Sequence, residues 1–135
     1  METNIKVLIV DDMPAMRTIV RDMLEQIGFK DLTEAEDGDA AWRQVQDAAE
    51  SGTGGFGLIV SDWVMPSMSG VELLRMVRNY SESQDIPFLM ITGERDQEQF
   101  SEAESAGATA YIVKPFNAGQ LKGKIQELFD RTKSP

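Results

Sequence analysis

The sequence contains no cysteine and no histidine among its 135 residues. These absences exclude disulfides, thiol nucleophiles, Ser–His–Asp triads and zinc sites built on nitrogen or sulfur ligands. Any chemistry must therefore use carboxylates, hydroxyls, lysine or the backbone. A chain without cysteine is also compatible with a reducing compartment, and we expect a cytoplasmic protein.

Long apolar runs and positive charge are scarce as well. No apolar stretch approaches the ~20 residues needed to cross a bilayer, and the start METNIKVLIVDD lacks the basic region of a signal peptide. Lys and Arg number 13 against 23 Asp and Glu, which gives a formal charge of -10. Such a chain repels phosphate backbones and anionic lipids, so we expect it to bind neither nucleic acid nor membrane.

The length suits a single domain. A chain of this size can bury roughly two thirds of its unfolded surface in one core, and it leaves no room for a second folded module. We therefore expect one domain over residues 1–135, with a core of about residues 4–131 and no output domain.

Short apolar runs alternate with helical patterns along the chain. The expected strands are residues 5–10, 31–36, 58–61, 87–91 and 109–113. Three are continuous apolar runs, typical of a parallel sheet covered on both faces, whereas the polar run 31–36 suits an edge strand. Apolar residues recur at helical spacing around residues 16–27, 41–49, 71–77, 100–106 and 121–129. Five strand–helix units predict an α/β fold with a doubly wound parallel sheet and right-handed crossovers.

Carboxylates follow two of these strands at the edge where such sheets bind ligands. Asp11 and Asp12 come after the first strand and Asp62 closes the third, so the three side chains should converge. Taken singly, they could be helix caps or solvated loop charges. Together they repel one another unless a cation neutralises them, and hard oxygen ligands suit Mg²⁺. Lys114, after the fifth strand, is a natural cation at this edge.

An aspartate at a strand end can attack phosphorus and form an acyl phosphate if a metal screens the incoming anion and donors hold its oxygens. Lys114 would supply charge, and Thr92 after the fourth strand would supply a hydroxyl. Gly93, beside that hydroxyl, has no side chain to obstruct entry. The set therefore favours phosphoryl chemistry over isolated surface charges.

Four ordered motifs resemble the receiver domain of bacterial response regulators. They are VDD at 10–12, SDWVMPSMSG at 61–70, ITG at 91–93 and AYIVKPF at 110–116. The segment EAEDG at 34–38 adds a similarity to CheY-like, single-domain chemotaxis regulators. The resemblance covers nearly the whole chain. It implies the flavodoxin-like receiver fold, (βα)5, with strand order 2-1-3-4-5.

The resemblance also implies the metal site and the site of modification. Asp62 would be the phosphoacceptor. Asp12, Asp62 and the backbone carbonyl of Val64 would bind Mg²⁺ directly, and Asp11 would act largely through a metal-bound water. Val64 stands where the chemotaxis regulators carry a polar Asn, and an apolar side chain there should alter the access of the attacking water and thus the lifetime of the acyl phosphate.

The remaining roles concern the phosphoryl oxygens and the switch. Lys114 would hold one phosphoryl oxygen, next to a cis peptide bond to Pro115. Thr92 would donate to another oxygen, and Tyr111 would turn inward as the two side chains move together. Such coupling is a population shift between two arrangements of Thr92 and Tyr111.

The resemblance implies partners as well. A histidine kinase would be the phosphodonor, and a phosphatase could remove the group. The output would be read on the face formed by the helix near 100–106, the strand 109–113 and the helix near 121–129, by a flagellar motor switch protein or by another partner. The helix near 100–106 is acidic, which is compatible with a partner other than the motor switch protein. Its acidic residues are Asp96, Glu98, Glu102 and Glu104. We expect a monomer.

Three functions can be compared on this basis. The first is a phosphorylation-activated response regulator of two-component signalling, in flagellar motor switching or in a non-motor pathway or phosphorelay. It is a switch that catalyses only its own phosphoryl transfer and dephosphorylation, and not an enzyme. An aspartyl phosphatase would need a second Asp two residues after the nucleophile, where Val64 stands. A degenerate, unphosphorylated interaction module conflicts with the complete set of site residues.

Overall fold

The computed structural model describes residues 2–52, 55–65, 67–93 and 110–133. Five parallel strands form one sheet in the order β2-β1-β3-β4-β5. The strands are β1 (Lys6–Val10), β2 (Asp31–Ala35), β3 (Leu58–Asp62), β4 (Phe88–Thr92) and β5 (Ala110–Val113). The expected α/β class, the strand order and the edge position of the polar strand β2 are confirmed.

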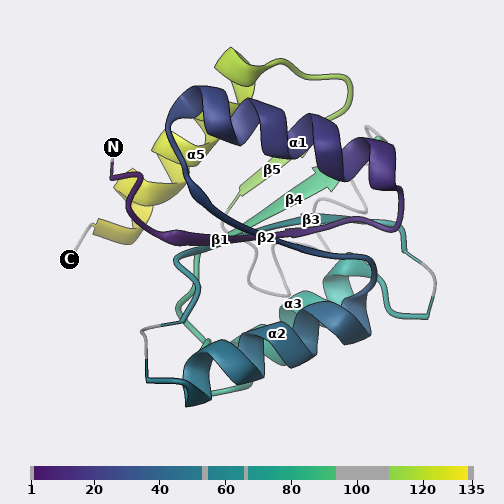
Figure 1. The fold of residues 1–135 in the computed structure, drawn as a ribbon, viewed down its shortest axis with the longest axis vertical. Coiled ribbons are helices and arrows are strands. Elements are labelled where there is room, and N and C mark those ends of the chain that lie inside the picture. The colour runs from purple at the N-terminus through teal and green to yellow at the C-terminus, as the bar shows by residue number, and fades with distance from the viewer. Residues whose placement is uncertain (1, 53–54, 66, 94–109, 134–135) are drawn as a thin grey trace.

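Helices cover both faces of the sheet (Figure 1). They are α1 (Pro14–Ile27), α2 (Gly38–Glu50), α3 (Gly70–Arg78) and α5 (Ala118–Lys133). Helices α1 and α5 pack on one face, and α2 and α3 pack on the other. The helix expected near residues 100–106, with its acidic side chains, lies outside the described residues.

The core consists of two apolar layers that the sheet separates. Successive side chains of a strand point to opposite faces, so one strand supplies both layers. In β1, Val7 and Ile9 pack towards α1 and α5, whereas Leu8 and Val10 pack towards α2 and α3. This two-sided burial explains the continuous apolar runs in the sequence, and it holds the strand ends that carry the polar residues.

Helix α3 begins in direct contact with the end of β3. A capping box starts the helix, in which Ser69 Oγ accepts from the Glu72 N–H at 3.2 Å. Gly70 follows, and a Cβ atom at this position would collide with the backbone carbonyl oxygen of Asp62 and lie 2.8 Å from Met90 Sδ. A glycine is therefore required for α3 to approach the site this closely.

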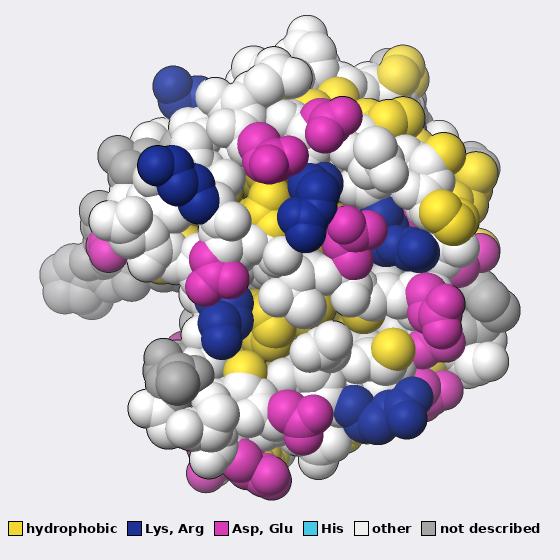
Figure 2. All heavy atoms as spheres, in the orientation of Figure 1, with side chains coloured by type: hydrophobic (Ala, Val, Ile, Leu, Met, Phe, Trp, Pro, Cys, Tyr) yellow, Lys and Arg dark blue, Asp and Glu magenta, His cyan; other side chains and the backbone are white. Residues whose placement is uncertain are grey.

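The surface carries charges of both signs. Figure 2 shows acidic and basic side chains interspersed over one face, including neighbouring pairs along the band where α1 meets β2. None of the helices in the described part of the chain combines the length and the apolar content that a membrane span requires.

Candidate functional site

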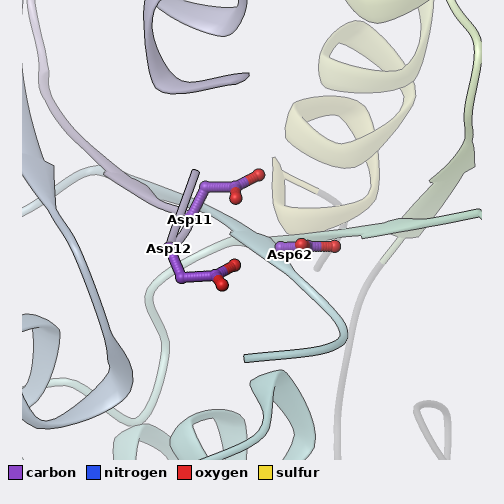
Figure 3. Close-up of side chains that lie close together, drawn as sticks. All are labelled: Asp11, Asp12 and Asp62. Carbon is purple, nitrogen blue, oxygen red and sulfur yellow. The ribbon is translucent and has the colours of Figure 1, made fainter. Parts of the chain in front are cut away.

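Three carboxylates meet at the carboxyl edge of the sheet (Figure 3). Asp11 and Asp12 follow β1, and Asp62 is the last residue of the neighbouring strand β3. One carboxylate oxygen from each residue lies within 4.8 Å of the others. Asp11 and Asp62 are buried, whereas Asp12 is exposed. The predicted convergence is therefore present, with the exposed member giving the cluster access to solvent.

The oxygens of Asp11 have unequal surroundings. Oδ1 accepts a hydrogen bond from the Met13 N–H at 2.9 Å. Oδ2 is buried and accepts no hydrogen bond from any described residue. Buried polar atoms nearly always have a partner, so an orphaned oxygen beside two further carboxylates indicates a place for a ligand. A divalent cation with hard oxygen ligands, such as Mg²⁺, fits this donor set.

Burial and like charges work against ionisation of the two buried carboxylates. Burial raises the pKa of Asp11 and outweighs the Met13 N–H, which lowers it, while the charge of Asp62 raises it further. The pKa of Asp62 is also raised by burial, although the Lys114 ammonium opposes this effect. The folded chain therefore holds these groups in surroundings that favour a cation.

Lys114 and Thr92 lie on the other side of Asp62. Lys114 follows β5, and its Nζ lies 3.4 Å from Asp62 Oδ1. The backbone N–H of Lys114 donates to the Thr92 carbonyl at 2.7 Å, which ties the end of β5 to the buried end of β4. The peptide bond between Lys114 and Pro115 is cis, as expected. Asp62 thus stands between two acidic neighbours and one ammonium group.

The other residues singled out in the sequence lie around this centre. Val64 is in the loop after β3 and is 69% exposed. Gly93 follows β4 and is exposed, and a Cβ atom added there would meet no described atom within 4 Å. Tyr111 is a half-buried residue of β5, and Lys124 Nζ lies 5.9 Å from its ring centroid. The structure thus shows one conformation of Tyr111, in which the residue is half-buried and lies beside Lys124.

Two residues beside the site were not expected from the sequence. Gly70 touches the Asp62 backbone, and Arg17 donates from Nη1 to the Asp11 carbonyl oxygen at 2.7 Å. Gly70 could have been suspected because it follows a capping serine at the start of a helix. Arg17 had only a weak signal, because an arginine on a helix surface is ordinarily a solvated charge.

Comparison with known proteins gives a match over most of the chain. Residues 7–126 match the family model described as the response regulator receiver domain. The matched range begins in β1 and ends within α5, so it includes all the site residues described above.

Individual relatives are similar over nearly their full length. Chemotaxis protein CheY-3 of Vibrio cholerae is 44% identical over 128 residues, which are 95% of this chain and 94% of that protein. Chemotaxis protein CheY of Pseudomonas aeruginosa is 42% identical over 126 residues, 93% of this chain and 97% of that protein. The structure of chemotaxis response regulator CheY4 of Vibrio cholerae superimposes with a TM-score of 0.82 at 36% identity, covering 93% of this chain and 99% of the other.

The raised pKa of Asp11 predicts that its ionised form destabilises the metal-free protein. Asp11→Asn removes the charge and keeps an oxygen for the Met13 N–H, so the variant should have the larger free energy of unfolding at neutral pH. Because the pKa is raised above 3.8 in the folded state, this gain should be absent below that pH and should grow as the pH rises through the higher, folded-state pKa. Urea unfolding in EDTA over a pH series measures it.

The exposed neighbour Asp12 supplies the control for this prediction. Asp12→Asn also removes one negative charge from this loop, but that charge is exposed to solvent. Its free energy of unfolding should therefore increase less than that of Asp11→Asn. A loss of stability in Asp11→Asn, or a gain that does not change with pH, would contradict the prediction.

Proposed function

The chain belongs to the response regulator receiver family, and from this premise we propose that Asp62 accepts a phosphoryl group from a histidine kinase in the presence of Mg²⁺. The position of Asp62 carries the proposal. It is buried, it faces Asp11 and Asp12 on one side, and it pairs with the Lys114 ammonium on the other. With a divalent cation on the three carboxylates and the Lys114 ammonium beside it, Asp62 could meet an anionic phosphoryl group without strong net repulsion.

In the proposed transfer, a carboxylate oxygen of Asp62 forms a bond to phosphorus while the nitrogen–phosphorus bond of the kinase phosphohistidine breaks. The bonding electron pair leaves with the imidazole nitrogen, so atoms and charge balance. Asp12, Asp62 and the Val64 carbonyl would hold Mg²⁺ directly and Asp11 largely through a water, and the ion would supply positive charge for the carboxylates and the phosphoryl oxygens.

Lys114 and Thr92 would hold the product. The Lys114 ammonium already lies at Asp62, so it needs little movement to contact a phosphoryl oxygen on the same carboxylate. Thr92 ends the adjacent strand β4, from which its hydroxyl would donate to a second oxygen. Tyr111 lies on β5, opposite Met90 in the sheet register, where it would move together with Thr92. Phosphorylation would thereby shift the population of Tyr111 conformations.

We class the protein as a switch rather than an enzyme, because it would catalyse only its own phosphorylation and dephosphorylation. We further propose a role in chemotaxis, as the names of its relatives suggest. We propose that a motor switch protein docks on the side formed by β5 and α5, where Tyr111 and Lys124 border a pocket of about 490 Å³. The protein would act in the cytoplasm as a monomer.

Incubation with acetyl phosphate and Mg²⁺ should add one phosphoryl group to the protein, measured as intact mass. Asp62→Asn should show no adduct because the attacking oxygen is lost, and EDTA should abolish the adduct on the unaltered chain. Asp130→Asn changes an exposed aspartate of α5 and should be phosphorylated normally.

A missing adduct would require a second measurement. Beryllofluoride mimics the phosphoryl group without depending on its lifetime, and Trp63, next to Asp62, should report its binding by a change in emission. Binding would support an intact site with a short-lived acyl phosphate. If neither an adduct nor beryllofluoride binding is observed, phosphorylation of Asp62 is contradicted, and the unphosphorylated interaction module becomes the favoured function.

Val64→Asn should shorten the lifetime of the acyl phosphate several-fold. The exposed valine side chain cannot orient a water molecule, whereas an amide at this position can hold one within hydrogen-bond reach of the phosphoryl group. Loss of the adduct by mass, after removal of the phosphodonor, measures the rate. Val64→Ala uncovers the site without orienting water and should have the smaller effect. An unchanged or longer lifetime in Val64→Asn would show that water access does not set the rate.

The chemotaxis role can be tested by capture of the motor switch protein. Immobilised protein should retain the flagellar switch protein of its own organism only when beryllofluoride and Mg²⁺ are present. Asp62→Asn should retain none under the same conditions, because it lacks the activating group. A non-motor pathway would be favoured if the switch protein is captured equally well without beryllofluoride. It would also be favoured if the protein binds beryllofluoride but captures no switch protein.

A further inference from the structure

Two arginines of α1 share one glutamate of the edge strand β2. Arg17 Nε lies 3.0 Å from Glu34 Oε1, and Arg21 Nε lies 3.0 Å from Glu34 Oε2. The two arginines are one helical turn apart, so both face the same strand. The Arg17 side chain is 16% exposed and the Arg21 side chain 33%. The arrangement is a partly buried ion-pair network and not a set of solvated charges.

The two arginines differ in their second contact. Arg17 Nη1 donates to the Asp11 carbonyl oxygen at 2.7 Å. Arg21 Nη2 donates to the Leu32 carbonyl oxygen at 3.0 Å, in the middle of β2 and away from the acidic cluster. Each arginine therefore makes one ion pair and one backbone hydrogen bond, and of the two only Arg17 contacts the loop that carries the aspartates.

Arg17 completes the fixing of that loop. The Asp11 N–H donates to the Ala35 carbonyl at 3.2 Å, and Arg17 holds the carbonyl at the other side of the same residue. Helix α1 begins at Pro14, and Met13 at the N-cap provides no side-chain hydrogen bond to hold the helix start. A guanidinium can only donate, so Arg17 does not cap the free N–H groups of α1; it ties the first turn of the helix to the Asp11 backbone instead.

We propose that Arg17 is a positioning residue of the metal site. It fixes the backbone at Asp11 so that the Asp11 and Asp12 carboxylates face Asp62, and Glu34 holds the guanidinium in place. The inference rests on the proposed function, because Mg²⁺ binding is the property that the positioned loop serves. Residues that orient metal ligands from outside the coordination sphere commonly change metal affinity by about 10–100-fold when they are replaced.

Electrostatics alone predicts the opposite outcome. Removing a positive charge near three carboxylates should strengthen the binding of a divalent cation. Arg17→Met and Arg21→Met each remove one charge and one ion pair to Glu34, so they are matched in charge. A weaker affinity in the Arg17 variant therefore cannot arise from charge and has to reflect the position of the loop.

The experiment is a Mg²⁺ titration of the unphosphorylated protein, followed by Trp63 emission in a Trp42→Phe background and repeated by calorimetry. Arg17→Met should bind Mg²⁺ about tenfold more weakly than the parent. Arg21→Met should stay within about twofold of the parent or bind slightly more tightly. Urea unfolding of both variants accompanies the titration, and a merely structural role would lower stability and affinity in parallel for the two.

The outcomes separate this inference from the proposed function. If the parent binds Mg²⁺ and the two variants have equal affinity, the inference is wrong and the proposed function stands. If the parent itself binds no Mg²⁺, both fail. Should Arg17→Met not fold, Arg17→Lys keeps the charge but lacks the planar fork that reaches Glu34 and Asp11 together. It should also bind Mg²⁺ more weakly, and an affinity equal to that of the parent would overturn the inference.

Discussion

The repulsion between carboxylates at one edge of the sheet is the constraint on which the rest of this structure depends. Parallel strands end on the same side, so Asp11, Asp12 and Asp62 are brought together by topology. Their proximity and the burial of two of them disfavour ionisation. The two apolar layers must stabilise the fold enough to offset this cost, and almost every residue of β1 and all of β3 are buried because helices cover both faces of the sheet.

The Asp11 and Asp62 backbones are held by different elements, which makes the cluster a property of the whole fold. Gly70 lets α3 lie directly against the Asp62 carbonyl, and the Arg17 side chain from α1 holds the Asp11 carbonyl. Lys114 reaches the Asp62 carboxylate from the end of β5. A shift of α1, of α3 or of the end of β5 would therefore change the distances between the carboxylate oxygens.

The sequence predicts the fold and the chemical centre because both depend on local patterns. Continuous apolar runs specify buried strands, and the carboxylates that follow them must lie at one edge once the strands are parallel. The contact of Arg17 depends on how α1 packs across β1 and β2, which no local pattern contains. The closeness of Gly70 to Asp62 depends in the same way on the approach of α3 to β3. Sequence motifs thus identify the reactive groups, whereas the supports that set their geometry require the tertiary structure.

The distribution of positive charge around the site follows from what a divalent cation requires. Within the described part of the chain, the ion pairs place Lys114 on Asp62 and no second cationic side chain on these aspartates. Three carboxylates and one ammonium leave a formal charge that one divalent cation balances. Arg17 reaches the same loop but binds a backbone carbonyl, and its ion pair is with Glu34, which it shares with Arg21. A guanidinium directed at a carboxylate would fix the loop equally well, but it would cancel part of the negative charge that attracts the metal.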